Sequence, residues 1–122
     1  VSETTTSITV SKLLFHHLDN LLLFRLTSFI SPFREERRKI SEMHSHNFHQ
    51  IYLSADLNTC EKRDPKGLYK KARLGLIKDF TGIDSTYEKP EDPEIILNGS
   101  EKTPEDLSEE IISYLLKNDI IN

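Results

Sequence analysis

One polar stretch of 28 residues, residues 63–90, limits what this chain can fold into, because it offers little to a hydrophobic core. Its second half holds a ring beside a turn (Phe80 and Gly82), a carboxylate (Asp84) and the segment Tyr-Glu-Lys-Pro. Long polar segments between apolar ones lie on the surface and often carry function. The first half is cationic, and its charge predicts a mobile segment that closes over an anion. The cations are Lys66, Lys70, Lys71, Arg73 and Lys78.

Helical and strand patterns alternate along the rest of the chain. Apolar residues recur at helical spacing over residues 13–22, and an apolar run predicts a buried strand at residues 22–29. Such alternation predicts an α/β fold in which helices flank a parallel sheet. Ligands of such folds bind beyond the carboxyl ends of the strands, which here include residues 30–31 and 55–56. Further helices are predicted at residues 33–44, 57–63, 68–77 and 104–116, further strands at 49–55 and 94–97, and an ordered loop at 79–93.

Residues that start or end helices support these boundaries. Asp56 and Thr103 are of the type that caps a helix N-terminus, and Pro104 suits a first helical position. Pro32 suits the first turn of the helix predicted at residues 33–44. Gly75 should weaken the end of the helix predicted at residues 68–77.

Composition excludes several classes of protein. The 122 residues suit a single domain, and their formal net charge of −4 argues against a general nucleic-acid binder. The longest apolar run, residues 21–24, is far shorter than the roughly 20 residues of a membrane span. The polar N-terminus does not predict a secretory signal, and the single cysteine, Cys60, fits a reducing compartment. We therefore expect a cytoplasmic protein. The first residue is not Met, which indicates a fragment or a faulty gene model.

Ser31 follows the predicted strand at residues 22–29 and precedes Pro32. A serine at the end of a strand can present its hydroxyl and its backbone amide to a ligand. It can equally cap an ordinary turn into the next helix, since Ser-Pro pairs are common in turns. The residues alone favour the turn.

The polar stretch contains two side chains with possible roles at an anion site. Lys66 stands next to Gly67, which suits a cation that swings onto a ligand. Phosphoryl transfer builds negative charge on the moving oxygens, and positioned cations stabilise this charge. Alternatively, such a basic run is the solvated face of a helix. Phe80 could stack on a purine, or it could simply pack the segment onto the core.

Three histidines raise the question of a metal site: His44, His46 and His49. No CxxC or HExxH motif accompanies them, so we predict a solvated loop and no metal site. Residues 98–100, Asn-Gly-Ser, fit a glycosylation sequon, but no other feature indicates secretion.

Residues 27–121 resemble the C-terminal half of adenylylsulfate kinase. The match is nearly residue for residue over residues 63–87, and the segment Phe-Ile-Ser-Pro at residues 29–32 belongs to it. This family moves the γ-phosphate of ATP onto the 3′-hydroxyl of adenosine 5′-phosphosulfate, which gives PAPS during sulfate assimilation. The resemblance implies a partial P-loop-kinase-like fold with three layers.

The resemblance also implies roles for single residues at the sulfate-carrying substrate. Ile30, Ser31 and Lys66 would contact this substrate, and Asp79 and Phe80 would frame its adenine. Ser31 and Lys66 would be the catalytic candidates. The sequence shows no base that would activate the Ser31 hydroxyl for a covalent role.

The second nucleotide of the family is ATP with Mg²⁺. The resemblance places the ATP base between Arg63 and the turn formed by Asn98, Gly99 and Ser100. Complete relatives are expected to be homodimers. Residues 115–122 resemble the end of kinase domains that are fused to ATP sulfurylase, so such a fusion is a further expectation.

Two family motifs are missing from this sequence. Neither the phosphate-binding loop GxxGxGK[ST] nor the substrate-gripping segment Asp-Gly-Asp-Asn-x-Arg occurs in it, and residues 1–26 form a divergent segment. Without the loop, the nest of amides that binds ATP phosphates is lost. We therefore expect the chain to be inactive alone. The alternatives are a non-catalytic remnant that binds a nucleotide or pairs with an intact subunit, and a truncated gene model.

Overall fold

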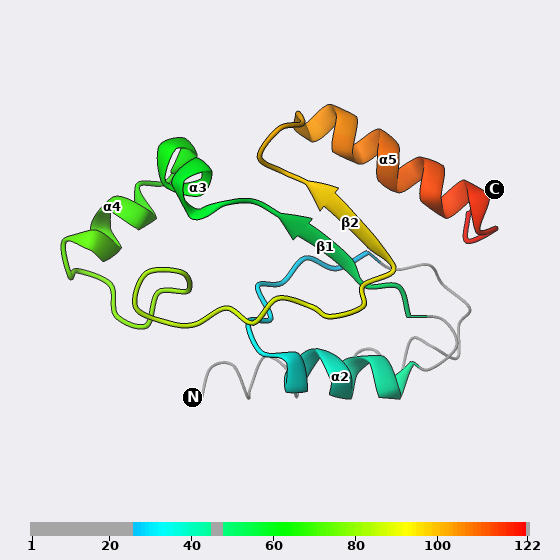
Figure 1. Cartoon of the computed structure of the whole chain (residues 1–122), viewed down its shortest axis with the longest axis horizontal. Coiled ribbons are helices and arrows are strands. Elements are labelled where there is room, and N and C mark those ends of the chain that lie inside the picture. Colours follow the sequence, from blue (N-terminus) through cyan, green and yellow to red (C-terminus); the bar gives the residue numbers. More distant parts are fainter. Residues whose placement is uncertain (1–25, 45–47, 122) are drawn as a thin grey trace.

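The computed structural model describes residues 26–44 and 48–121. Within them, β1 and β2 form a parallel two-stranded sheet, in which Ile51 lies opposite Ile95 and Ser54 lies opposite Asn98 (Figure 1). The predicted partial α/β fold, with a parallel sheet and helices around it, is confirmed. In chain order the elements are α2 (Arg34–Met43), β1 (Ile51–Ser54), α3 (Leu57–Arg63), α4 (Leu68–Arg73), β2 (Ile95–Asn98) and α5 (Pro104–Lys117).

The small core lies where α5 packs against β2. Leu97 of β2 is 2% exposed, and Leu115 of α5 is also buried. Figure 1 draws α5 and α2 on opposite sides of the two strands. Helices α3 and α4 and the whole polar stretch lie in the connection from β1 to β2. Because β1 and β2 are neighbours in the sheet, this connection begins and ends at adjacent strands.

Both predicted N-caps are confirmed. The Asp56 side chain accepts a hydrogen bond from the Thr59 amide at the start of α3. Thr103 and Asp106 form a reciprocal capping box at the start of α5, where Pro104 is the first helical residue. A local side chain therefore satisfies one of the free amides at each of the two helix starts.

Helix α4 ends at Arg73, four residues before the predicted end. Gly75 has a positive φ of 73°, and its amide bonds back to the Ala72 carbonyl. The Leu76 amide bonds to the Lys71 carbonyl, which completes the hydrogen-bond pattern of a Schellman motif. Glycine adopts this left-handed conformation at little cost, so Gly75 stops the helix rather than merely weakening it.

The strand predicted at residues 22–29 is wrong for its described part. Residues 26–29 have no regular structure, and residues 22–25 lie outside the described residues. Leu26 is 67% exposed and Phe29 is 57% exposed, so the apolar run that suggested a buried strand is not covered by the rest of the described chain. Pro32 also precedes α2 rather than lying in its first turn. No helix in the described parts is long and apolar enough to cross a membrane.

Candidate functional site

Arg63 reaches from the end of α3 to the turn after β2. Its Nη1 donates to the Gly99 carbonyl at 2.6 Å, and its Nη2 lies 3.5 Å from the Ser100 carbonyl. The Gly99 amide in turn donates to the Ser54 carbonyl at 2.7 Å. The structure thus brings together Arg63 and residues 98–100, the group expected at the ATP base.

Asp56 ties this turn to the start of α3. Its backbone amide donates to the Ser100 hydroxyl at 3.0 Å, and the same hydroxyl donates to the Asp56 carboxylate at 2.8 Å. The Asn98 side chain accepts from the Ser100 amide, which tightens the turn. Hydrogen bonds from Thr59, followed by the one from Ser100, lower the pKa of Asp56 to about 2. Asp56 therefore stays ionised at neutral pH and holds the turn.

Asp64 shapes the start of the polar stretch. Its carboxylate accepts from the amides of Tyr69 and Lys70, both at 3.1 Å, and so caps α4 from outside the helix. Gly67, which lies between Asp64 and Tyr69 in the chain, has a left-handed φ of 65°. Lys66 is exposed beside this glycine. The cap fixes the backbone on which Lys66 sits and leaves its side chain in solvent.

Asp84 shapes the turn that carries Asp79 and Phe80. Its carboxylate accepts from the Asp79 amide at 2.9 Å and from the Phe80 amide at 2.5 Å. Asp79 has a positive φ of 54°, which is uncommon for a residue other than glycine. The Phe80 ring meets the Tyr69 ring edge to face, with ring centroids 4.9 Å apart. One carboxylate thus fixes two neighbouring predicted substrate contacts, and the aromatic pair joins them to α4.

An ion pair connects α4 to α3. Arg73 Nη2 lies 2.6 Å from Glu61 Oε1, and this hydrogen bond is the largest cause that lowers the pKa of Glu61. Gly82 lies close to Leu57, because a Cβ at Gly82 would be 3.4 Å from the Leu57 Cδ1. The polar stretch therefore rests on α3 at two places.

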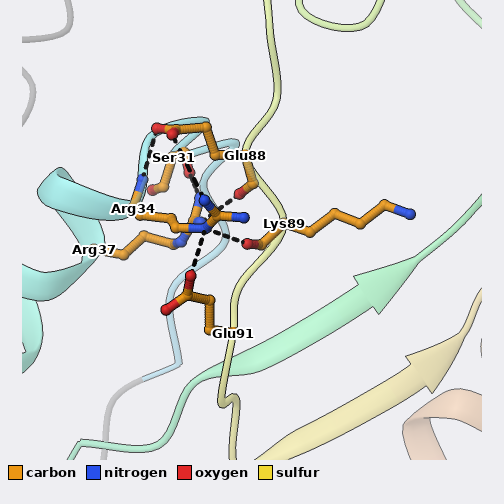
Figure 2. A network of polar contacts seen from close by, with 6 residues as sticks. All are labelled: Ser31, Arg34, Arg37, Glu88, Lys89 and Glu91. Carbon is orange, nitrogen blue, oxygen red and sulfur yellow. Dashed lines mark hydrogen bonds and ion pairs between the residues drawn. The ribbon is translucent and has the colours of Figure 1, made fainter.

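Ile30 and Ser31 directly precede Pro32, which is bonded to the other end of the polar stretch. Ile30 is 68% exposed, and Ser31 has a positive φ of 41°. The Pro32 carbonyl accepts from the Glu88 amide at 2.8 Å. Arg37 of α2 donates from Nη1 to the Ser31 carbonyl at 2.5 Å and from Nη2 to the Glu88 carbonyl (Figure 2).

The comparisons with known proteins agree on one family. The model of the adenylylsulphate kinase family matches residues 4–98. The chain belongs to the adenylylsulphate kinase family. The structural and sequence relatives below support the same assignment, and the resemblance noted from the sequence is confirmed.

Two curated relatives and one solved structure show how much of such a kinase is present. The chain is 50% identical over 107 residues to the adenylyl-sulfate kinase of Staphylococcus carnosus, which covers 87% of the chain and 52% of that relative. It is 48% identical over 99 residues to that of Clostridium acetobutylicum, covering 81% and 50%. The structure of the Mycobacterium tuberculosis APS kinase CysC in complex with AMPPNP and APS matches with a TM-score of 0.64 and 40% identity, over 71% of this chain and 51% of that one. The chain spans about half the length of these relatives.

The predicted site residues of this kinase family member fall into three groups. Arg63 joins residues 98–100, Asp79 and Phe80 share one turn near α4, and Ile30 and Ser31 precede Pro32, whose carbonyl accepts from the Glu88 amide. Lys66 is exposed just before α4. Sequence reasoning missed the residues that hold these groups in place. Asp56 was visible only as a helix cap, and nothing in the sequence pointed to Arg37.

The histidine cluster shows no metal-binding geometry within the described part. His49 Nδ1 lies 2.6 Å from the Tyr114 hydroxyl of α5, and His46 lies outside the described residues. No group of three or more His, Cys, Asp and Glu side chains in residues 26–44 and 48–121 could hold a metal ion.

Proposed function

We propose that this chain is part of an adenylylsulfate kinase that moves the γ-phosphate of ATP onto the 3′-hydroxyl of adenosine 5′-phosphosulfate. The proposal rests on one observation above all, the turn at Asp84. It holds two neighbouring candidate contacts, Asp79 and Phe80, beside Tyr69 of the basic helix α4. A fixed ring and nearby cations suit an adenine that carries an anionic tail.

Lys66 is the cation proposed to contact the phosphosulfate. It is exposed and follows the backbone fixed by Asp64, so its ammonium can turn toward a ligand without disturbing packing. A charge-assisted hydrogen bond to a sulfate or phosphate oxygen is about twice as strong as a neutral one. Lys66 would thereby orient the substrate and offset charge on the transferring group.

Ile30 and Ser31 are proposed to contact the same substrate from the other side. Ile30 is largely exposed and offers an apolar surface. Ser31 offers its hydroxyl and amide, while its carbonyl is taken by Arg37. Ser31 is proposed as a contact and not as a covalent acceptor of phosphate, because activation of a serine hydroxyl needs an adjacent base.

Arg63 is proposed to lie against the base of ATP. Its guanidinium is exposed, and two carbonyls of residues 99 and 100 orient it. A guanidinium held in one plane can stack on an aromatic base. ATP with Mg²⁺ supplies the transferred phosphoryl group in this reaction.

For the complete kinase we propose a homodimer in the cytoplasm, and the resemblance also suggests a fusion to ATP sulfurylase. Sedimentation velocity tests the dimer directly. A strictly monomeric chain at micromolar concentration would count against the dimer without affecting the proposed substrate.

A second candidate function is nucleotide binding without catalysis, favoured because no GxxGxGK[ST] loop occurs in the 122 residues. The coding sequence upstream of the 122 residues separates the candidates, because a GxxGxGK[ST] loop encoded there would favour the kinase. Two measurements on the chain itself test binding and turnover: calorimetric titration with adenosine 5′-phosphosulfate, and ADP release with ATP, Mg²⁺ and that substrate. We expect binding and no turnover above a blank without protein. Turnover would show that the 122 residues suffice as a kinase. Absence of binding would contradict the proposed substrate.

A further inference from the structure

Arg37 spans two segments that are far apart in sequence. Its two terminal nitrogens donate to the carbonyls of Ser31 and Glu88, which are separated by 57 positions in the chain. A guanidinium is a planar fork with several fixed donors, so one side chain can bridge two carbonyls. An ammonium is a point charge and cannot reproduce this geometry.

The orientation of Arg37 is fixed by a stack of rings. Its guanidinium carbon lies 5.6 Å from the centre of the Tyr87 ring, a cation–π contact. Tyr87 stacks on Tyr52 of β1, with ring centroids 6.3 Å apart and an interplanar angle of 14°. The bridge is therefore connected to the sheet, and the half-buried guanidinium has little freedom to turn away.

Ser31 has a backbone conformation that needs outside support. Its φ of 41° is uncommon for a residue other than glycine. Such conformations persist where surrounding contacts determine them, and they are frequent at ligand sites. The hydrogen bond from Arg37 to the Ser31 carbonyl is a contact of this kind.

Arg34 supports the same junction from the exposed side. Its Nε donates to the Lys89 carbonyl at 2.8 Å, and it pairs with the carboxylates of Glu88 and Glu91 (Figure 2). These ion pairs are exposed and screened by salt, so they add less than the bridge. Two arginines one turn apart on α2 thus face the same stretch of residues 86–91, which we call the lid stem.

We propose that Arg37 is a positioning residue that fastens residues 29–33 to the lid stem, so that Ile30 and Ser31 act on the same ligand as Asp79 and Phe80. The ligand is the adenosine 5′-phosphosulfate of the proposed function, and this part of the inference rests on that function. Arg37 itself touches backbone carbonyls and acts through them. Without it, only the backbone bond from Glu88 to Pro32 and the exposed contacts of Arg34 would join the two groups, and their relative position would be less fixed.

Amide hydrogen exchange on the free chain tests the fastening without any ligand. The substitution Arg37→Lys keeps the charge and removes the bridge. We expect the Glu88 amide, which donates to the Pro32 carbonyl, and the other amides of the lid stem to exchange about tenfold faster or more. Arg38→Lys is the matched control, because Arg38 pairs with Glu35 and Glu42 of its own helix. It should leave these amides unchanged.

Calorimetric titration with adenosine 5′-phosphosulfate tests the positioning. Arg37→Lys should weaken binding to the folded chain by about tenfold or more, since an arginine bridge is worth more than one neutral hydrogen bond. Combining it with Phe80→Ala should cost less than the product of the single effects, because both act on one ligand geometry. A purely structural role would lower the melting temperature and leave the affinity of the folded fraction unchanged.

Each outcome decides the inference. Unchanged exchange at Glu88 in Arg37→Lys, or equal changes in Arg38→Lys, would overturn the fastening. Faster exchange with unaltered affinity would overturn the positioning role. A wild-type chain that binds no adenosine 5′-phosphosulfate would refute the proposed function and the ligand named here, while the exchange result still decides the fastening. If Arg37→Lys does not fold, Arg34→Lys takes its place, and a smaller acceleration confined to the lid stem is expected.

Discussion

Replacing Asp84 by alanine should loosen the turn that presents Asp79 and Phe80. The carboxylate accepts two backbone hydrogen bonds, at 2.9 and 2.5 Å. Asp84 is exposed, so water can replace part of what is lost, and each bond resembles a helix N-cap contact worth about 0.5–1 kcal/mol. Loss of both should cost about 1–2 kcal/mol of local stability, which is roughly a 5- to 30-fold change in the opening equilibrium. Asp84→Asn keeps one acceptor oxygen and should cost about half as much.

Amide exchange measured by NMR is the assay, with the Asp79 and Phe80 amides as reporters. Asp92→Ala is the matched control, because Asp92 is an exposed carboxylate in the same loop region. The strand amides of Ile51–Ser54 should keep their wild-type rates in all three variants. Equal exchange of Asp79 and Phe80 in the wild type and in Asp84→Ala would refute the reasoning. An acceleration shared by β1 would do so as well, since the effect would then be global.

Three further predictions concern other parts of the site. Lys66→Ala should weaken binding of adenosine 5′-phosphosulfate by about tenfold at an unchanged melting temperature, because an exposed cation contributes a charge-assisted contact and little packing. Lys117→Ala, at another exposed lysine, is the control, and an equal loss of affinity in both variants would refute the role of Lys66. The folded pKa of Asp56, about 2, lies below the roughly 3.9 of an unfolded chain, so its stabilising effect is complete above about pH 5 and is lost as the pH falls from there through 2. Urea unfolding at several pH values should show this slope in the wild type and a smaller one in Asp56→Asn, and identical slopes would contradict it. Gly99→Ala should destabilise the chain by about 1 kcal/mol, because the added Cβ would lie 3.0 Å from the Leu53 Cδ1 and 3.3 Å from the Ser54 carbonyl oxygen. A urea midpoint equal to that of the wild type would contradict this prediction and show that the turn accommodates the methyl group.

The elements that the sequence predicted correctly are those that local chemistry determines. Thr103 and Pro104 mark the start of α5 because the cap and the first helical position are read from adjacent residues. Asp56 marks α3 in the same way. The early end of α4 was only partly foreseen, since Gly75 could either weaken a helix or close it with a left-handed turn.

The wrong strand has a different origin. An apolar run is typical of a buried strand only if another part of the chain covers it, and this information is not local. Leu26, Phe29 and Ile30 remain exposed in the described part, where no strand pairs with them. A chain that spans about half the length of its relatives can carry apolar segments that it does not cover itself.

The same difference between local and long-range information applies to the candidate site. The family resemblance supplied Lys66, Asp79 and Phe80, and their roles stay predictions. Arg37 could not be found from its neighbours, because its partner Glu88 lies 51 positions away. Long-range backbone acceptors leave no pattern in the sequence, since any residue type supplies a carbonyl.

Ligand-dependent amide exchange tests the central claim most directly, namely that the polar stretch closes over adenosine 5′-phosphosulfate. Residues 64–90 carry much charge and little buried surface, so without ligand they should be less protected than β1 (Ile51–Ser54). Saturating adenosine 5′-phosphosulfate should slow amide exchange around Lys66 and Phe80, because closure of the polar stretch over the ligand excludes water. The exchange rates of β1 should stay nearly unchanged. A polar stretch that is already as protected as β1 without ligand, or that shows the same rates with and without it, would contradict the account.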